Sequence, residues 1–146
     1  MEYILISNYS FYDKDYNSTF RDDYQKYKFF QIGSTFSTLV PFYQNFLKQI
    51  IGNKADEKFK DFALSKVQTE QLKTIFSQKI DETLPKYEDY KGTKIPHKRL
   101  EWKGKIYELH LGLNSPNNRK IDDFYKIVTI AEECLKENKP MFLSIE

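Results

Sequence analysis

The stretch 99–145 constrains the fold of this chain most, because it combines a strand pair, a helix and a final strand. Residues 99–102 and 105–113 are rich in strand-forming side chains and are separated only by Lys103 and Gly104. A two-residue connection that contains glycine predicts a tight β-hairpin. In its second strand, four residues share the face that we expect to look into the core: Tyr107, Leu109, Leu111 and Leu113.

After the hairpin, the sequence predicts a turn-rich loop over residues 114–120, a helix over about 121–138 and a short strand over 141–145. The apolar stripe that we expect on the inner face of this helix is Ile121, Phe124, Ile127, Val128, Ala131, Cys134 and Leu135. A strand, a helix and a second strand form a crossover unit. We therefore expect strands 105–113 and 141–145 to be parallel neighbours with a right-handed connection.

The N-terminal part predicts one strand, over residues 3–7, followed by helices. A short helix is expected around residues 20–27, and a second runs from about residue 37 or 38 to Gly52. Asp56 is expected to cap a third helix with Phe59, Phe62 and Ala63 inward, and Thr69 with Glu70 to open a fourth with Leu72, Ile75, Phe76 and Ile80 inward. Phe46, Ile75, Leu109, Leu111, Phe124 and Val128 are expected in the core.

Together these elements predict an α+β fold, with roughly five helices packed on a small mixed β-sheet. The chain is expected to be a single globular domain, residues 1–146, that ends in the hairpin–helix–strand unit.

Composition narrows the classes of function. Lys and Arg number 23 against 21 Asp and Glu, which is a smaller basic excess than proteins that bind phosphate backbones usually carry. The one cysteine, Cys134, rules out an internal disulfide framework and fits a reducing compartment. The apolar N-terminal run is too short for a signal peptide, and no stretch approaches the ~20 apolar residues of a membrane helix. We expect a soluble cytoplasmic protein without membrane attachment.

No residue pattern predicts a catalytic site, a metal site or a cofactor. His110 and Glu108 share the outward face of a predicted strand, with Glu101 across the hairpin, but simple alternation on an exposed polar sheet face often produces such a triplet, and we favour that interpretation over an acid/base site. The Glu101-Trp102-Lys103 triplet resembles the Glu-x-Lys part of restriction-endonuclease-like nucleases, which would imply Mg²⁺ on Glu101. The aspartate expected on a preceding strand cannot be placed. We expect that the protein is not an enzyme. A small metal-dependent nuclease or hydrolase ranks third, after the two binding functions given below.

The segment 8–31 contains nine aromatic residues among its 24, together with eight charged residues. A small domain cannot easily bury that many rings beside that many charges, so some rings are expected at the surface. Tyrosine and tryptophan are enriched at protein-binding surfaces. The candidate partner-binding residues are Tyr12, Tyr16, Asp22, Asp23, Tyr24, Tyr27 and, outside this segment, Trp102.

A basic stretch, residues 86–105, carries seven cationic side chains: Lys86, Lys91, Lys94, Lys98, Arg99, Lys103 and Lys105. Tyr87, Tyr90 and Trp102 are interleaved with them. Cations beside stacking rings suit single-stranded nucleic acid. They also suit an acidic protein patch, and a solvated connector would show the same pattern.

In size, composition, hairpin–helix–strand tail and lack of an enzyme motif, the chain resembles the stand-alone bacterial immunity proteins of contact-dependent and polymorphic toxin systems. This resemblance implies a protein-binding inhibitor whose partner is a cognate toxin, in many cases a nuclease. The alternative is a nucleic-acid-binding or antitoxin-like regulator that uses the basic stretch 86–105.

Overall fold

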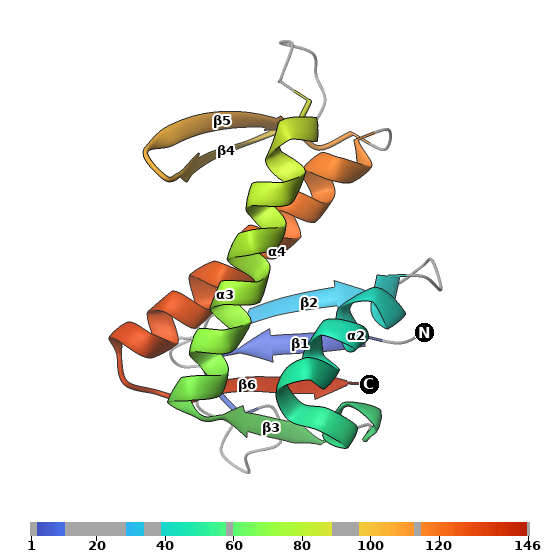
Figure 1. The fold of residues 1–146 in the computed structure, drawn as a ribbon, viewed down its shortest axis with the longest axis vertical. Helices are drawn as coiled ribbons and strands as arrows, with labels where there is room; N and C mark the ends of the chain where they lie inside the picture. The colour runs from blue at the N-terminus through green and yellow to red at the C-terminus, as the bar shows by residue number, and fades with distance from the viewer. Residues whose placement is uncertain are drawn as a thin grey trace, which may run out of the picture. The chain divides into compact units, whose positions relative to one another are not determined.

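The computed structural model describes residues 3–10, 29–33, 39–57, 60–88, 97–112 and 115–145. The chain forms two compact units, one from residues 1–75 with 126–146 and the other from residues 76–125. Within the described residues the fold is α+β, with three α-helices, two 3₁₀ helices and two antiparallel sheets (Figure 1). The predicted α+β class is therefore confirmed. No helix among the described residues is long and apolar enough to cross a membrane.

The first unit contains a four-stranded sheet in the order β2-β1-β6-β3 (Figure 1). Its strands are β1 (Tyr3–Ser7), β2 (Phe29–Gly33), β3 (Asp61–Leu64) and β6 (Met141–Ile145). In the centre of the sheet, Ile4 faces Ile145 and Ile6 faces Leu143 across the β1–β6 pair, and all four side chains are buried. Strands covered on both faces have continuous apolar runs, which explains why β1 and β6 were recognisable in the sequence.

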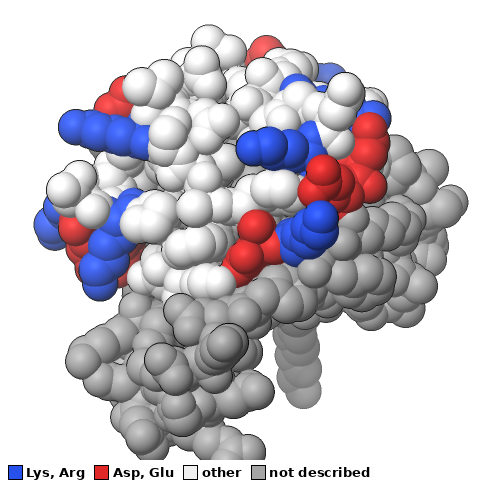
Figure 2. Space-filling view, turned by 90° about the horizontal axis from the view of Figure 1, so that it is seen from below, with Lys and Arg blue, Asp and Glu red and all other residues white. Residues whose placement is uncertain are grey.

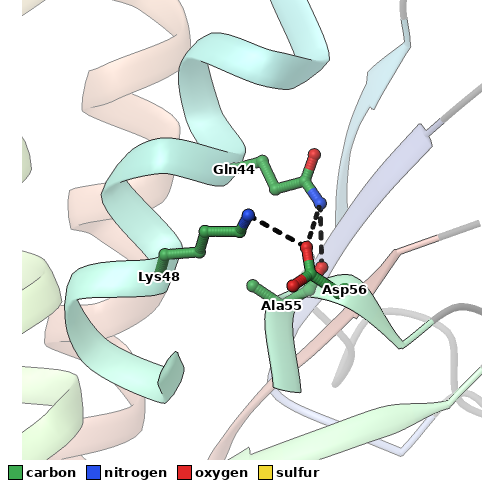
Figure 3. A network of polar contacts seen from close by, with 4 residues as sticks. All are labelled: Gln44, Lys48, Ala55 and Asp56. Carbon is green, nitrogen blue, oxygen red and sulfur yellow. Dashed lines mark hydrogen bonds and ion pairs between the residues drawn. The ribbon is translucent and has the colours of Figure 1, made fainter. Parts of the chain in front are cut away.

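Helix α2 (Leu39–Ile51) places Tyr43 and Leu47 in the core of the first unit, and the helix also contacts β2. Gly52, with a φ of +63°, ends the helix as predicted, because glycine adopts the left-handed conformation without a Cβ penalty. The 3₁₀ helix η2 (Gly52–Asp56) then folds back along α2. There the Gln44 amide donates a hydrogen bond of 3.0 Å to the Ala55 carbonyl, and Lys48 lies 3.0 Å from the Asp56 carboxylate (Figure 3).

Helix α3 (Lys66–Thr83) begins at a capping box. Ser65 Oγ accepts a hydrogen bond of 3.1 Å from the backbone N–H of Gln68, and Gln68 Oε1 accepts one of 2.9 Å from the backbone N–H of Ser65. The prediction that Thr69 opens this helix is wrong, because the cap lies four residues earlier and the Thr69 hydroxyl donates to the Ser65 carbonyl inside the first turn. The predicted inner face is confirmed at Leu72, Phe76 and Ile80, which are buried.

The second unit contains the predicted hairpin, formed by β4 (His97–Trp102) and β5 (Lys105–His110). Trp102 pairs directly with Lys105, so Lys103 and Gly104 alone make the turn. Their φ values of 49° and 79° are the left-handed values that a tight hairpin turn requires. Leu100 and Leu109 are the buried residues of the inner face.

Helix α4 (Pro116–Lys136) starts within the predicted loop 114–120, so the loop prediction is wrong over residues 116–120. The prediction took Pro116 and the asparagines as turn formers, but proline is favoured in the first turn of a helix. The helix ends with Asn138 at a φ of 54° and the Lys139 amide bonded to the Cys134 carbonyl at 2.9 Å. The predicted inner face is buried at Ile121, Phe124, Ile127, Val128, Ala131 and Cys134.

The predicted sheet was wrong in its topology. Strands β5 and β6 belong to different sheets, and β6 pairs antiparallel with β1 and β3 instead of lying parallel to β5. The crossover rule assumed that consecutive strands are neighbours, whereas the doubly apolar β6 is paired on both sides inside the four-stranded sheet.

The predicted number of helices is also too high for the described residues. The third predicted helix is absent there: Asp56 ends η2, and Phe62 and Ala63 lie in strand β3. A short apolar run does not separate a helix from a strand by its periodicity. Phe46, Ile75 and Leu111, expected in the core, are only half-buried. The predicted helix around residues 20–27, and the positions of Phe59 and Leu113, lie outside the described residues.

Candidate functional site

The 76–125 unit contains a pocket of about 430 Å³ that combines aromatic rings with lysines, and we call it the aromatic–basic pocket. The end of α3, the 3₁₀ helix η3 (Leu84–Lys86) with the residue after it, and the hairpin all contribute to its wall. The lining residues are Asp81, Leu84, Pro85, Tyr87, Trp102, Lys103, Lys105 and Tyr107.

The register of the hairpin explains why its residues line the pocket. Directly paired residues of an antiparallel ladder share one face, so Leu100 and Tyr107 lie on the same face as Trp102 and Lys105. Leu100 is buried, whereas Tyr107 and Trp102 are only partly covered. The inner face of the hairpin therefore passes from buried core into accessible aromatic surface as the strands approach the turn.

Asp81 on α3 holds one wall of the pocket. The indole Nε1–H of Trp102 donates a hydrogen bond of 2.9 Å to Asp81, and Lys103 Nζ donates one of 2.6 Å to the other carboxylate oxygen. The bond from Lys103 and, next, that from Trp102 lower the pKa of Asp81 below its ordinary value of 3.8. The indole thus has its only polar group satisfied, while Lys103 Nζ lies 5.9 Å from the ring centroid and the Tyr125 ring packs edge to face with it at 6.4 Å.

Tyrosine rings form the other wall. Tyr87 and Tyr107 meet edge to face, with ring centroids 5.2 Å apart and planes at 88°. This geometry is favoured by the quadrupole of aromatic rings. Lys105 Nζ lies 5.3 Å from the centroid of Tyr107, within the range of a cation–π interaction. Among the described residues, no carboxylate lies within ion-pair distance of Lys105.

A buried asparagine fixes the chain beside Tyr87. The side chain of Asn118, on the first turn of α4, accepts a hydrogen bond of 2.8 Å from the Glu88 amide. It donates bonds of 2.6 Å and 2.8 Å to the carbonyls of Glu88 and His110. The Ser115 hydroxyl adds a bond of 2.9 Å to the Glu88 carboxylate and lies 2.6 Å from His110 Nδ1. Glu88, the neighbour of Tyr87, is therefore tied to both β5 and α4.

The three candidate acid/base residues, Glu101, Glu108 and His110, do not contact one another in any hydrogen bond or ion pair of the described residues. Glu108 lies opposite Arg99 and contacts both Arg99, at 3.5 Å, and His97, at 3.7 Å. Glu101 lies opposite Ile106, and His110 contacts Ser115. Lys103 of the Glu-x-Lys triplet lies in the hairpin turn, and its ammonium forms an ion pair with Asp81. Within the described residues, no three His, Cys, Asp or Glu side chains could hold a metal ion together.

Of the predicted partner-binding residues, Trp102 lines the aromatic–basic pocket. The remaining ones, Tyr12, Tyr16, Asp22, Asp23, Tyr24 and Tyr27, lie outside the described residues. From the basic stretch, the structure brings Lys103 and Lys105 to the pocket together with Tyr87. No sequence signal pointed to Asp81, because the helical periodicity of α3 does not show which exposed residue meets the hairpin.

On one face of the molecule, the described residues carry charges of both signs side by side (Figure 2). On the face in view in Figure 2, Lys and Arg side chains lie beside Asp and Glu side chains, with uncharged residues between them. A protein that tracks a nucleic-acid backbone would present a continuous basic groove. The described residues in the view of Figure 2 form no such groove.

No protein-family model, no curated protein and no solved structure matches the chain. Function is therefore inferred from the chemistry of the aromatic–basic pocket.

Proposed function

We propose that this protein is a protein-binding inhibitor of the immunity type, and that the aromatic–basic pocket is an anchor site for its partner, a cognate toxin. The observation that carries the proposal is the accessible ring surface of Trp102, Tyr87 and Tyr107, already held in place before any partner binds. Tryptophan and tyrosine dominate the energetics of protein interfaces. They also lose few rotamers on binding.

The local contacts support binding more than catalysis. The Asp81 carboxylate is engaged by Lys103 and Trp102, and the buried Ser115 hydroxyl is engaged by Glu88 and His110. Such satisfied networks make a surface rigid, which lowers the cost of binding. We accordingly propose that the protein has no enzymatic activity of its own.

The test is capture of a partner from cells of the source organism, followed by affinity measurements with single variants. Trp102→Ala should weaken binding by about 2 kcal/mol or more, which corresponds to roughly thirtyfold. Ile106→Ala is the matched control, because Ile106 is 50% exposed on the same hairpin and does not line the pocket. A folded Trp102→Ala variant that binds as tightly as the wild type would exclude the pocket as an anchor site.

A second candidate function, binding of single-stranded nucleic acid, is favoured by the same rings next to Lys103 and Lys105. It predicts that affinity for an oligonucleotide falls steeply with salt concentration. A nuclease is the third alternative. Metal-dependent cleavage by the purified protein that Glu101→Gln abolishes, with the fold intact, would overturn the proposal of a non-enzyme.

A further inference from the structure

Building on the proposed function, we infer that the aromatic–basic pocket takes an acidic peptide segment of the partner, in which a carboxylate side chain adjoins an aromatic one.

The rings select an aromatic side chain. The hydrogen bond from Trp102 to Asp81 satisfies the indole N–H, and Lys103 and Tyr125 already contact the ring. A ligand therefore meets the partly exposed ring surface that these contacts leave. Tyr87 and Tyr107 are fixed edge to face beside it. A flat apolar group that enters the pocket, which has a volume of about 430 Å³, can stack against these rings.

The two lysines of the pocket differ in charge balance. Lys103 is neutralised by Asp81 at 2.6 Å, whereas Lys105 contacts the Tyr107 ring and no carboxylate among the described residues. A cation–π contact engages the ammonium without neutralising its charge. Lys105 is therefore the cation that can pair with a carboxylate of the peptide. It lies beside Tyr107, against which the adjoining aromatic side chain of the peptide can stack.

An acidic peptide fits these charges better than a nucleic acid does. Asp81 and Lys103 form an ion pair of 2.6 Å, so Lys105 is the one cation of the pocket lining that no carboxylate of the described residues neutralises, whereas a nucleic-acid strand presents a phosphate at every nucleotide. The 76–125 unit carries ten Lys and Arg against eight Asp and Glu, which is a small excess for backbone binding. A peptide presents its carboxylate at one position, and the single unneutralised lysine of the pocket matches that pattern.

Trp102 is the only tryptophan of the chain, so its fluorescence reports on the pocket directly. The probes are two capped pentapeptides, one with a central tyrosine flanked by two glutamates and one with glutamines in their place. A short single-stranded oligothymidine is the third probe. A peptide that fills one pocket is expected to bind with a Kd on the order of 0.1–1 mM. Each titration is repeated at high ionic strength.

Lys105→Gln removes the positive charge at this position and tests its contribution to peptide binding. Lys105→Arg keeps a positive charge and should bind the acidic peptide like the wild type. Lys86→Gln is the matched control, because Lys86 is an exposed lysine of η3 that does not line the pocket. We expect Lys105→Gln to weaken binding of the acidic peptide by about fivefold, the upper range for an exposed ion pair. The same variant should leave the glutamine peptide unaffected, and Lys86→Gln should behave like the wild type.

The possible results separate the inference from the proposed function. Equal binding of both peptides, unaffected by Lys105→Gln, overturns the acidic ligand but leaves a protein-binding pocket. Tighter binding of the oligothymidine, with a steep salt dependence, overturns both in favour of nucleic acid. If no probe changes Trp102 fluorescence, the inference fails, and the capture experiment with Trp102→Ala decides the proposed function on its own.

Discussion

The indole nitrogen of Trp102 donates a hydrogen bond of 2.9 Å to the carboxylate of Asp81, a residue 21 positions earlier in the chain. This bond joins the end of helix α3 to the end of strand β4. The same carboxylate accepts a bond of 2.6 Å from Lys103 in the hairpin turn. One carboxylate therefore orients the ring and the turn that form the wall of the aromatic–basic pocket.

This arrangement predicts an acid-sensitive pocket. The pKa of Asp81 is lower in the folded protein than its ordinary value of 3.8, so the bonds from Lys103 and Trp102 stabilise the fold above pH 3.8. That stabilisation is lost as the pH falls through the folded-state pKa. Trp102 fluorescence should therefore change with a midpoint below pH 3.8, and Asp81→Asn should remove this step. A midpoint at or above this value, with helix content unchanged by circular dichroism, would contradict the prediction.

Asn118 should be among the least replaceable polar residues of the 76–125 unit. It is fully buried and makes three hydrogen bonds to the backbone of Glu88 and His110. Asn118→Ala leaves these backbone groups without their partner and should cost about 2–4 kcal/mol of unfolding free energy. Its neighbour Asn117 on the same helix turn is the control, and Asn117→Ala should cost less than about 0.5 kcal/mol. Equal losses in urea denaturation would argue against the role assigned to Asn118.

The parts of the fold that were predictable are those in which local pattern and final structure agree. Lys103-Gly104 predicts a turn between two strands that are consecutive in the sequence, so no distant segment is needed to form it. The apolar stripes of α3 and α4 are likewise buried along most of their length. Strand β3 was missed because it is short and because its partner β6 lies at the far end of the chain. The same limit applies to the pocket: Trp102 was identified by its chemistry, but Asp81 reaches it only through the packing of a helix against a hairpin.

Phe124 should be a main support of the core of the 76–125 unit. Its ring is buried and lies 5.7 Å from the ring of Phe76, centroid to centroid. Phe124→Ala should lower the free energy of unfolding by about 3–5 kcal/mol, because it removes a packed ring and leaves a cavity. Phe46, which the sequence also predicted to be a core residue, is only half-buried. Phe46→Ala should cost distinctly less in the same denaturation experiment, and the reverse order would remove Phe124 from the core.

Cys134 should be unreactive in the folded protein. Burial, together with the nearby charges of Glu133 and Glu137, raises the pKa of its thiol from 9.0 to about 11. Only the thiolate attacks thiol reagents, so at mildly alkaline pH Cys134 should react at the rate at which the protein opens. The raised pKa also predicts that the thiol stabilises the fold fully below pH 9.0 and loses this contribution as the pH rises toward 11.

The control for this reactivity is a protein in which the single thiol has been moved to the surface. The double variant Cys134→Ala, Gln78→Cys places it at an exposed position on α3, where it should react at once. Both proteins are treated with the same thiol reagent under native conditions, and the two rates are compared. Rapid modification of native Cys134, at a rate similar to that of the exposed control, would show that the buried end of α4 opens far more readily than its packing implies.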